Sequence, residues 1–334
     1  FSKLGKAYST PVIVLSGTGL KRKWVAAFGG GFNAGSAPEY GSAVYIIDLE
    51  ADGKIIKTID LTDSAGGYAN SMPSTLSAIT PDTTSVAKYT GAMLYGVDLE
   101  SKLWKINLTN SGAAYDASIL FDGEGTDKNM RASFFPVNAS IGTDAKLWLY
   151  WGTGDQQSLQ IRDASIQNRI FAIRDKDFPN YKKTGAAGTV TQCANTTGQG
   201  KACPKDTDLG WYVNLKTDEK VTGAIAVHNE VLYVSRYTPK ANNPCKPGTG
   251  TLSEHGYGCG KTDKETDLGS GILTGAVIYK GQIYVGISGA SENASGNPGG
   301  NQSFTQHGSI IIGNPNKTPA TDATVSQESW RELY

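Results

Sequence analysis

The chain has 334 residues with 31 basic and 31 acidic side chains, so its formal net charge at neutral pH is zero. This balance, without a basic run or an amphipathic helix, argues against nucleic acid or an anionic bilayer as a partner. No apolar stretch approaches the roughly 18 residues that a membrane-spanning helix needs. Charged residues make up only 19% and Gly is abundant, a composition typical of many short strands joined by turns.

Apolar runs in the first half of the chain predict two sheets and most of a third. The expected strands lie at 10–17, 23–31, 43–50 and 54–61, then 74–80, 91–99, 102–108 and 117–121, then 132–140, 146–154 and 168–174. The aromatic residues Trp148, Tyr150 and Phe171 alternate along such strands, which favours core packing over a stacking platform. The triple glycine at 29–31 precedes a loop instead of a helix, so we do not expect a phosphate cradle there.

Hairpin segments recur along the chain at intervals of about fifty residues. Tyr45–Glu50 returns as Tyr95–Glu100, and the segment 227–234 returns as 278–285. A period near 50 is typical of propeller blades, in which each small sheet packs on its neighbours. The sequence therefore predicts an all-β fold, a modified β-propeller built from four-stranded antiparallel blades.

Two polar stretches, 176–209 and 238–271, interrupt this pattern and are rich in Gly, Pro, Thr and Cys. We expect them to be long loop insertions, and such loops on a rigid scaffold often carry binding. The whole chain, 1–334, is expected to form one propeller domain. Because residue 1 is Phe and no signal peptide is visible, we expect an internal or processed fragment of a longer protein.

The cysteines fall into two pairs, with Cys193 ten residues before Cys203 and Cys245 fourteen before Cys259. Their Gly- and Pro-rich surroundings favour disulfides in an oxidising compartment, each contributing roughly 3 kcal/mol. A zinc site is the alternative, but neither pair has CxxC-like spacing. Three connectivities are open, and the sequential pairing is favoured.

One stretch offers oxygen ligands at alternating positions of a glycine-permissive loop. Its candidate calcium ligands are Asp122, Glu124, Thr126, Asp127 and Asn129. The stretch lacks a distant bidentate Glu in register and includes a lysine, so an ordinary solvated turn is the favoured alternative.

The three histidines, His228, His255 and His307, lie in unrelated contexts, and no Gly-x-Ser-x-Gly elbow occurs. The sequence therefore predicts a protein that is not an enzyme. One alternative is a quinoprotein-like, PQQ-dependent dehydrogenase, because that class also uses propellers with Tyr-x-x-Asp repeats and calcium. Another is a lectin-like module that stacks sugars on Trp211, Tyr237 and Tyr257.

The order of these segments resembles the C-terminal domain of the PilY/PilC family of type IV pilus-associated proteins. The matching segments are 4–12, 24–33, 43–48, 98–108, 151–154, 167–175, 210–215, 239–245 and 329–333. They span nearly the whole chain, and their order is more specific than any one of them. The resemblance implies a modified seven-bladed-type propeller with insertions.

The resemblance further implies a role in pilus assembly, control of retraction and surface adhesion. The implied partners are minor pilins at the pilus tip, reached through the full-length protein, and a host or abiotic surface. The implied location is extracytoplasmic: the pilus tip, the cell surface or outer membrane, and the periplasm in transit. Several members of the family bind calcium, but the corresponding loop here retains only Asp82 as an acidic residue. A calcium ion needs several oxygen ligands, so we do not transfer that site.

Overall fold

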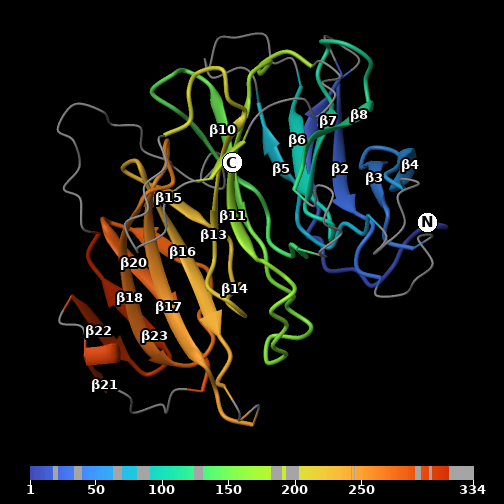
Figure 1. Cartoon of the computed structure of the whole chain (residues 1–334). Coiled ribbons are helices and arrows are strands. Elements are labelled where there is room, and N and C mark those ends of the chain that lie inside the picture. The colour runs from blue at the N-terminus through green and yellow to red at the C-terminus, as the bar shows by residue number, and fades with distance from the viewer. Residues whose placement is uncertain are drawn as a thin grey trace.

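The structure is a computed structural model in which the chain forms strands and turns (Figure 1). It describes residues 1–17, 22–33, 40–62, 70–80, 91–123, 131–181, 190–192, 203–241, 243, 245–289, 295–300 and 303–315. Across these ranges the only helical segment is the 3-10 turn η2 (Pro298–Gly300). No helix in the described part of the chain is long and apolar enough to cross a membrane.

The first two sheets are antiparallel and have four strands each, paired in chain order. The first contains β1 (Val12–Ser16), β2 (Lys23–Gly29), β3 (Ala43–Asp48) and β4 (Lys54–Asp60). The second contains β5 (Ser77–Ile79), β6 (Met93–Val97), β7 (Lys102–Asn107) and β8 (Ala117–Asp122). All eight strands lie within two residues or so of the ranges expected from the sequence, apart from β5, which is shorter.

The other three sheets described have five strands each. The third pairs β12 (Val190–Gln192), β13 (Gly210–Asn214), β11 (Arg169–Asp175), β10 (Leu147–Gly152) and β9 (Asn138–Ile141) in that order. The fourth contains β14 (Lys220–Val221), β15 (Ala226–His228), β16 (Val231–Thr238), β17 (Thr249–Gly256) and β18 (Thr262–Ser270). The fifth pairs β19 (Val277–Tyr279), β20 (Gln282–Gly286), β23 (Ile310–Gly313), β22 (Phe304–His307) and β21 (Ser295–Gly296).

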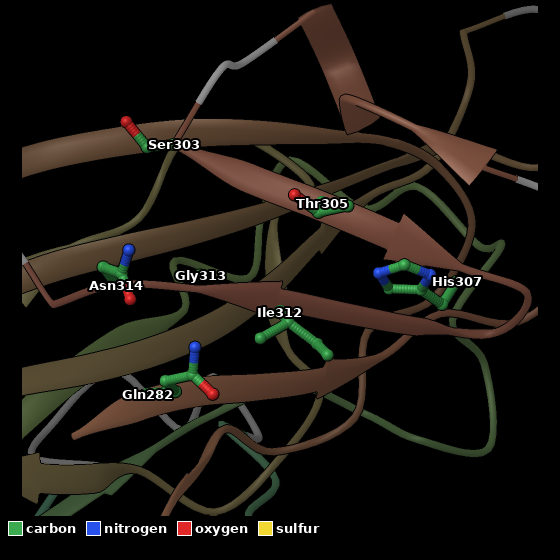
Figure 2. Close-up of a pocket in the computed structure, with 7 residues that line it drawn as sticks. All are labelled: Gln282, Ser303, Thr305, His307, Ile312, Gly313 and Asn314. Atoms are coloured by element: carbon green, nitrogen blue, oxygen red, sulfur yellow. The ribbon is translucent and has the colours of Figure 1, made fainter. Parts of the chain in front are cut away.

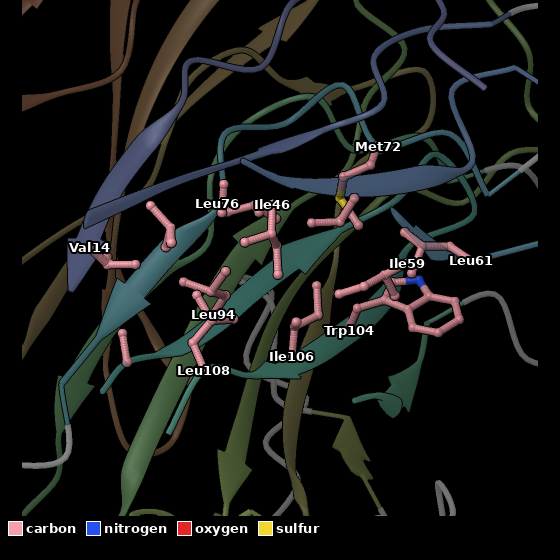
Figure 3. Close-up of a cluster of buried hydrophobic side chains, with 14 residues drawn as sticks. Val14, Ile46, Ile59, Leu61, Met72, Leu76, Leu94, Trp104, Ile106 and Leu108 are labelled. Atoms are coloured by element: carbon pink, nitrogen blue, oxygen red, sulfur yellow. The ribbon is translucent and has the colours of Figure 1, made fainter. Parts of the chain in front are cut away.

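The core consists of apolar clusters, each lying between two consecutive sheets. The first and second sheets share a cluster that includes Ile46 and Trp104 (Figure 3). Equivalent clusters join the second sheet to the third, the third to the fourth and the fourth to the fifth. A sheet buried on both faces needs apolar residues at successive positions, which is why every residue of β6 and β10 is buried.

This stacking of small sheets confirms the predicted β-propeller architecture. Figure 1 shows the first and fifth sheets on opposite sides of the molecule, with the other three between them. Within the described ranges, no apolar cluster contains residues of both the first and the fifth sheet. Among the described residues, each apolar cluster joins two consecutive blades.

The third, fourth and fifth sheets each contain one strand more than the four expected of a blade. In the third, β12 comes from the 176–209 stretch and pairs with β13 in parallel, adding an outer strand. In the fourth, two short strands take the place of one inner strand, and β14 and β15 pair with different parts of β16. Gly223 lies at this break, where a Cβ atom would be 2.2 Å from the backbone nitrogen of Gly275.

The prediction that 238–271 is a loop insertion is also wrong. This stretch contains β17 and β18, which pair along most of their length and complete the fourth sheet. Their sequences are polar, but several of their polar side chains point inward. Oε1 of Glu265 lies 2.7 Å from Nη2 of buried Arg236 in an ion pair, and the Ser253 hydroxyl lies 2.8 Å from Nε2 of His255. Because ion pairs and hydrogen bonds satisfy these inward polar side chains, the hydropathy pattern does not identify the two segments as strands.

Of the two sequence repeats, only one relates equivalent strands. Segments 227–234 and 278–285 form the hairpins β15–β16 and β19–β20, whose turn residues have positive φ as a type I′ turn requires. The other repeat relates β3, third in its sheet, to β6, second in its sheet. What these share is the turn, because Oδ1 of Asp48 and of Asp98 each accept a bond from the backbone two residues on.

Candidate functional site

A buried polar cluster surrounds Asp98 at the turn between β6 and β7. The Oδ1 atom of Asp98 accepts bonds of 2.9 Å from the backbone nitrogens of Glu100 and Lys102. Its Oδ2 atom accepts bonds from Nε1 of Trp104 at 2.7 Å and Nδ2 of Asn70 at 3.1 Å. Complete burial raises the pKa of the Asp98 carboxyl to about 6, and these hydrogen bonds oppose the rise.

The same turn carries an ion pair that is almost completely shielded from solvent. Nζ of Lys102 lies 2.5 Å from Oε2 of Glu100, and both side chains are at most 3% exposed. Asn70 also donates to Glu100, at 2.6 Å, and so links the two carboxyls of the turn. Both carboxyls are buried and hydrogen-bonded, and these bonds fix the shape of the hairpin.

A second buried charge network joins the second sheet to the third. Oδ2 of Asp175 at the end of β11 lies 2.6 Å from Nζ of Lys105 on β7. It also accepts a 2.6 Å bond from the hydroxyl of Tyr95 on β6. Burial, with the nearby Asp175 charge, raises the pKa of Tyr95 well above its usual value. All three side chains are buried, so the network holds two blades together.

The predicted calcium ligands lie almost entirely outside the described residues. Asp122 is the last residue of β8 and is half-buried. Glu124, Thr126, Asp127 and Asn129 lie outside the described residues, and so does Asp82. The calcium site therefore stays a prediction. Across the ranges that the structure describes, no group of three or more His, Cys, Asp or Glu side chains is placed to hold a metal ion.

The favoured sequential pairing of the cysteines is wrong. Cys203 is bonded to Cys259, 56 residues away, and Cys245 is exposed without a disulfide partner in the described part of the chain. Cys193 lies outside the described residues. The long-range bond forms because β13 packs beside the β17–β18 turn, where Nε1 of Trp211 donates to the carbonyl of Tyr257. Spacing along the chain contains no information about this contact between blades.

The three histidines have different environments. His255 is buried with Ser253, and burial together with nearby Arg236 lowers its pKa to about 3. A hydroxyl–imidazole pair with so little exposure is out of reach of a substrate and is structural. His228 is half-buried, which lowers its pKa, and His307 is exposed on β22.

The proposed aromatic platform for sugars does not exist. Trp211 and Tyr237 have no exposed surface. Nε1 of Trp211 donates to the carbonyl of Tyr257, and the Tyr237 hydroxyl accepts a bond from the backbone nitrogen of Gly248. Tyr257 is half-buried, and its hydroxyl contacts Thr143. The reason is that Trp211 packs in the apolar cluster between the third and fourth sheets, and Tyr237 is buried on β16 of the fourth. Trp148, Tyr150 and Phe171 are buried as predicted.

An open pocket of about 320 Å³ lies on the outward face of the fifth sheet. Its lining residues are Gln282, Ser303, Thr305, His307, Ile312, Gly313 and Asn314 (Figure 2). They come from β20, from β22 with the preceding Ser303, and from β23 with the following Asn314. The sequence analysis missed this site. The sequence offers only a weak signal for it, because Phe304 is the one apolar residue between Ser303 and His307.

No family model matches the chain, and no curated protein matches it. Among solved structures, it is similar to the Pseudomonas aeruginosa PilY1 C-terminal domain, with a TM-score of 0.56 and 14% identity, covering 86% of this chain and 72% of that one. The Comamonas testosteroni quinohemoprotein alcohol dehydrogenase gives a TM-score of 0.43 at 10% identity, covering 90% of this chain and 48% of that one. The Dos1 propeller gives a TM-score of 0.44 at 11% identity, covering 93% of this chain and 72% of that one. The chain therefore has the propeller fold of the PilY1 C-terminal domain, as the sequence resemblance predicted.

Proposed function

We propose that this chain is the non-enzymatic propeller of a type IV pilus-associated protein that supports pilus assembly, control of retraction and attachment to surfaces. The observation that carries the proposal is the fold likeness to the PilY1 C-terminal domain over 86% of the chain. The order of sequence segments that resembles this family, described above, supports it independently of the backbone comparison. At 14% identity the role itself remains the proposal.

The disulfide supports a location outside the cytoplasm. Cys203 and Cys259 form a bond of the kind that persists in oxidising compartments and is rare where thiols are kept reduced. This supports a location outside the cytoplasm, and the proposed pilus role adds the finer one: the pilus tip, the cell surface or outer membrane, with the periplasm as the route.

The partners in this proposal are minor pilins, contacted through the full-length protein, and a host or abiotic surface. The zero net charge of the chain argues that general electrostatic attraction does not drive these contacts. Recognition would then depend on local surfaces. A calcium ion held by Asp122 and the residues after it belongs to the same proposal, and titration with calcium in a calorimeter tests it directly.

A deletion in the native bacterium tests the pilus role. Removing the coding region should strongly reduce the number of surface pili and twitching motility, and expression of the full-length protein from a plasmid should restore both. The matched control is a full-length protein with Tyr40→Ala, which removes an exposed side chain. Unchanged pilus numbers and motility in the deletion strain would contradict the proposal.

A further inference from the structure

The outward face of the fifth sheet lacks a neighbouring blade in the described structure. Along β20, Ile283 and Val285 are buried against the fourth sheet, whereas Gln282 and Tyr284 point the other way. On β22 and β23, the same alternation turns Thr305, His307 and Ile312 outward. Cross-strand pairing brings Tyr284 opposite Ile312, and Ile312 opposite Thr305. Figure 2 shows the pocket residues gathered on these neighbouring strands.

The internal repeat shows what this face would contain if it packed against another blade. Segments 227–234 and 278–285 align position by position, so Val231 corresponds to Gln282 and Tyr233 to Tyr284. Val231 and Tyr233 are at most 2% exposed, because they pack against the fifth sheet. The fifth sheet has an amide where the fourth has an apolar contact residue. Burying that amide against a further sheet would cost free energy unless it were hydrogen-bonded.

The pocket on this face is polar and carries no permanent charge. Gln282 and Asn314 contribute amides, Ser303 and Thr305 contribute hydroxyls, and His307 contributes an imidazole. No Asp, Glu, Lys or Arg belongs to the lining. Its volume of about 320 Å³ lies at the lower end of the range for small-molecule sites. Groups of this kind both donate and accept hydrogen bonds, as a ligand rich in hydroxyls requires.

One of these groups is already oriented. The hydroxyl of Tyr284 donates to Oε1 of Gln282 at 2.9 Å, so the amide nitrogen of Gln282 remains as a donor. Tyr279 lies opposite Gln282 on β19 and is 57% exposed, with Nζ of Lys280 placed 5.3 Å from its ring centroid. An exposed aromatic ring beside polar groups offers apolar area together with hydrogen bonds. Ile312 adds an apolar patch within the pocket itself.

We propose that this face binds a neutral saccharide, with Gln282, Asn314, Ser303, Thr305 and His307 bonding its hydroxyls. The aliphatic C–H surface of the sugar packs on Tyr279 and Ile312. A sugar ring has both surfaces, whereas the pocket lining offers an anionic ligand no Lys or Arg, and a purely apolar ligand would leave the amides unpaired. The site is distinct from the aromatic residues that the sequence suggested. It does not depend on the pilus role, because binding is a property of the purified chain.

Binding is tested with the purified chain on an array of neutral and charged glycans, followed by calorimetry with the free sugar. We expect millimolar or tighter binding to at least one neutral glycan. Gln282→Val introduces the residue of the equivalent repeat position, and with Tyr279→Ala it should weaken binding about tenfold or more. Tyr40→Ala removes a ring of similar exposure, 50%, elsewhere on the surface and should leave affinity unchanged.

Three results would overturn the proposal. The first is no binding of any neutral glycan by a chain whose unfolding curve shows that it is folded. The second is binding that survives both Gln282→Val and Tyr279→Ala. The third is self-association through this face, seen in sedimentation as a dimer that Tyr279→Ala abolishes and sugars do not affect. An absence of glycan binding would not contradict the proposed pilus role, because the deletion experiment in cells tests that role separately.

Discussion

Cys203 and Cys259 are bonded across the boundary between two blades, with Cα atoms 4.8 Å apart although 56 residues separate them in sequence. Cys203 precedes β13 of the third sheet, and Cys259 lies in the β17–β18 turn of the fourth. The bond therefore reinforces a contact between neighbouring sheets that apolar packing already makes.

Replacing both cysteines by serine should lower the free energy of unfolding by about 4 kcal/mol, because the closed loop of 56 residues restricts the unfolded chain. Denaturant unfolding of the oxidised wild type and the double variant measures the difference. Peptide mapping without reduction should find Cys203 linked to Cys259. A peptide linking Cys193 to Cys203 would contradict the structure.

Removing one partner of the Lys105–Asp175 pair should be strongly destabilising. Lys105→Met leaves the Asp175 carboxylate buried without its cation, and we expect a loss of about 3–5 kcal/mol in unfolding free energy. The control is Lys216→Met, which breaks a pair with Glu265 whose lysine is 61% exposed and should cost about 1 kcal/mol or less. Equal losses in the two variants would show that the buried pair is not held as described.

Burial of His255 should make the protein less stable in mild acid. Its folded pKa of about 3 lies below the ordinary value of 6.5, so between these values the unfolded chain binds a proton that the folded protein does not. Above pH 6.5 the buried imidazole costs no free energy of unfolding, because it is neutral in both states. Below that pH the free energy of unfolding falls by about 1.4 kcal/mol per pH unit towards pH 3. Asp98 acts in the opposite direction, since its folded pKa is raised to about 6 and its contribution falls as pH rises through that value.

Comparison with His255→Gln isolates this effect, because Asp98 is present in both proteins. Between pH 6.5 and pH 5 the wild type should lose about 2 kcal/mol more than the variant. Urea unfolding at the two pH values measures both losses. Parallel pH profiles for the two proteins would mean that His255 titrates normally in the folded state.

Alanine substitutions at Gly260 and Gly281 separate the cost of backbone strain from the cost of a steric clash. Both have positive φ, so alanine strains the backbone at either position. At Gly260 the new Cβ would also lie 2.4 Å from Cε3 of Trp211, whereas nothing lies within 4 Å of it at Gly281. We expect Gly281→Ala to cost about 1–2 kcal/mol and Gly260→Ala about 1–3 kcal/mol more. Thermal unfolding followed by Trp fluorescence compares them, and equal costs would contradict the packing of Trp211.

The sequence predicted the strands of the first two sheets because their apolar runs are continuous and their turns contain Asp, Gly or Asn. It failed for β17 and β18, since Glu265, His255 and Ser253 face inward: Glu265 pairs with Arg236 on β16, and Ser253 and His255 bond to each other. It failed for Trp211 and Tyr237 for the converse reason, because an aromatic residue looks the same in sequence on a loop or between blades. The pocket beside Gln282 required the register of three strands, which only coordinates provide.

The apolar clusters couple each sheet only to the sheets before and after it, as far as the described residues show. In such a series the end members have one stabilising neighbour, whereas inner members have two. Loss of order under denaturing stress would therefore start at the termini and spread inward. Amide exchange should accordingly be slowest in β6, β10 and β11, whose residues are almost all buried, and faster in β4 and β19.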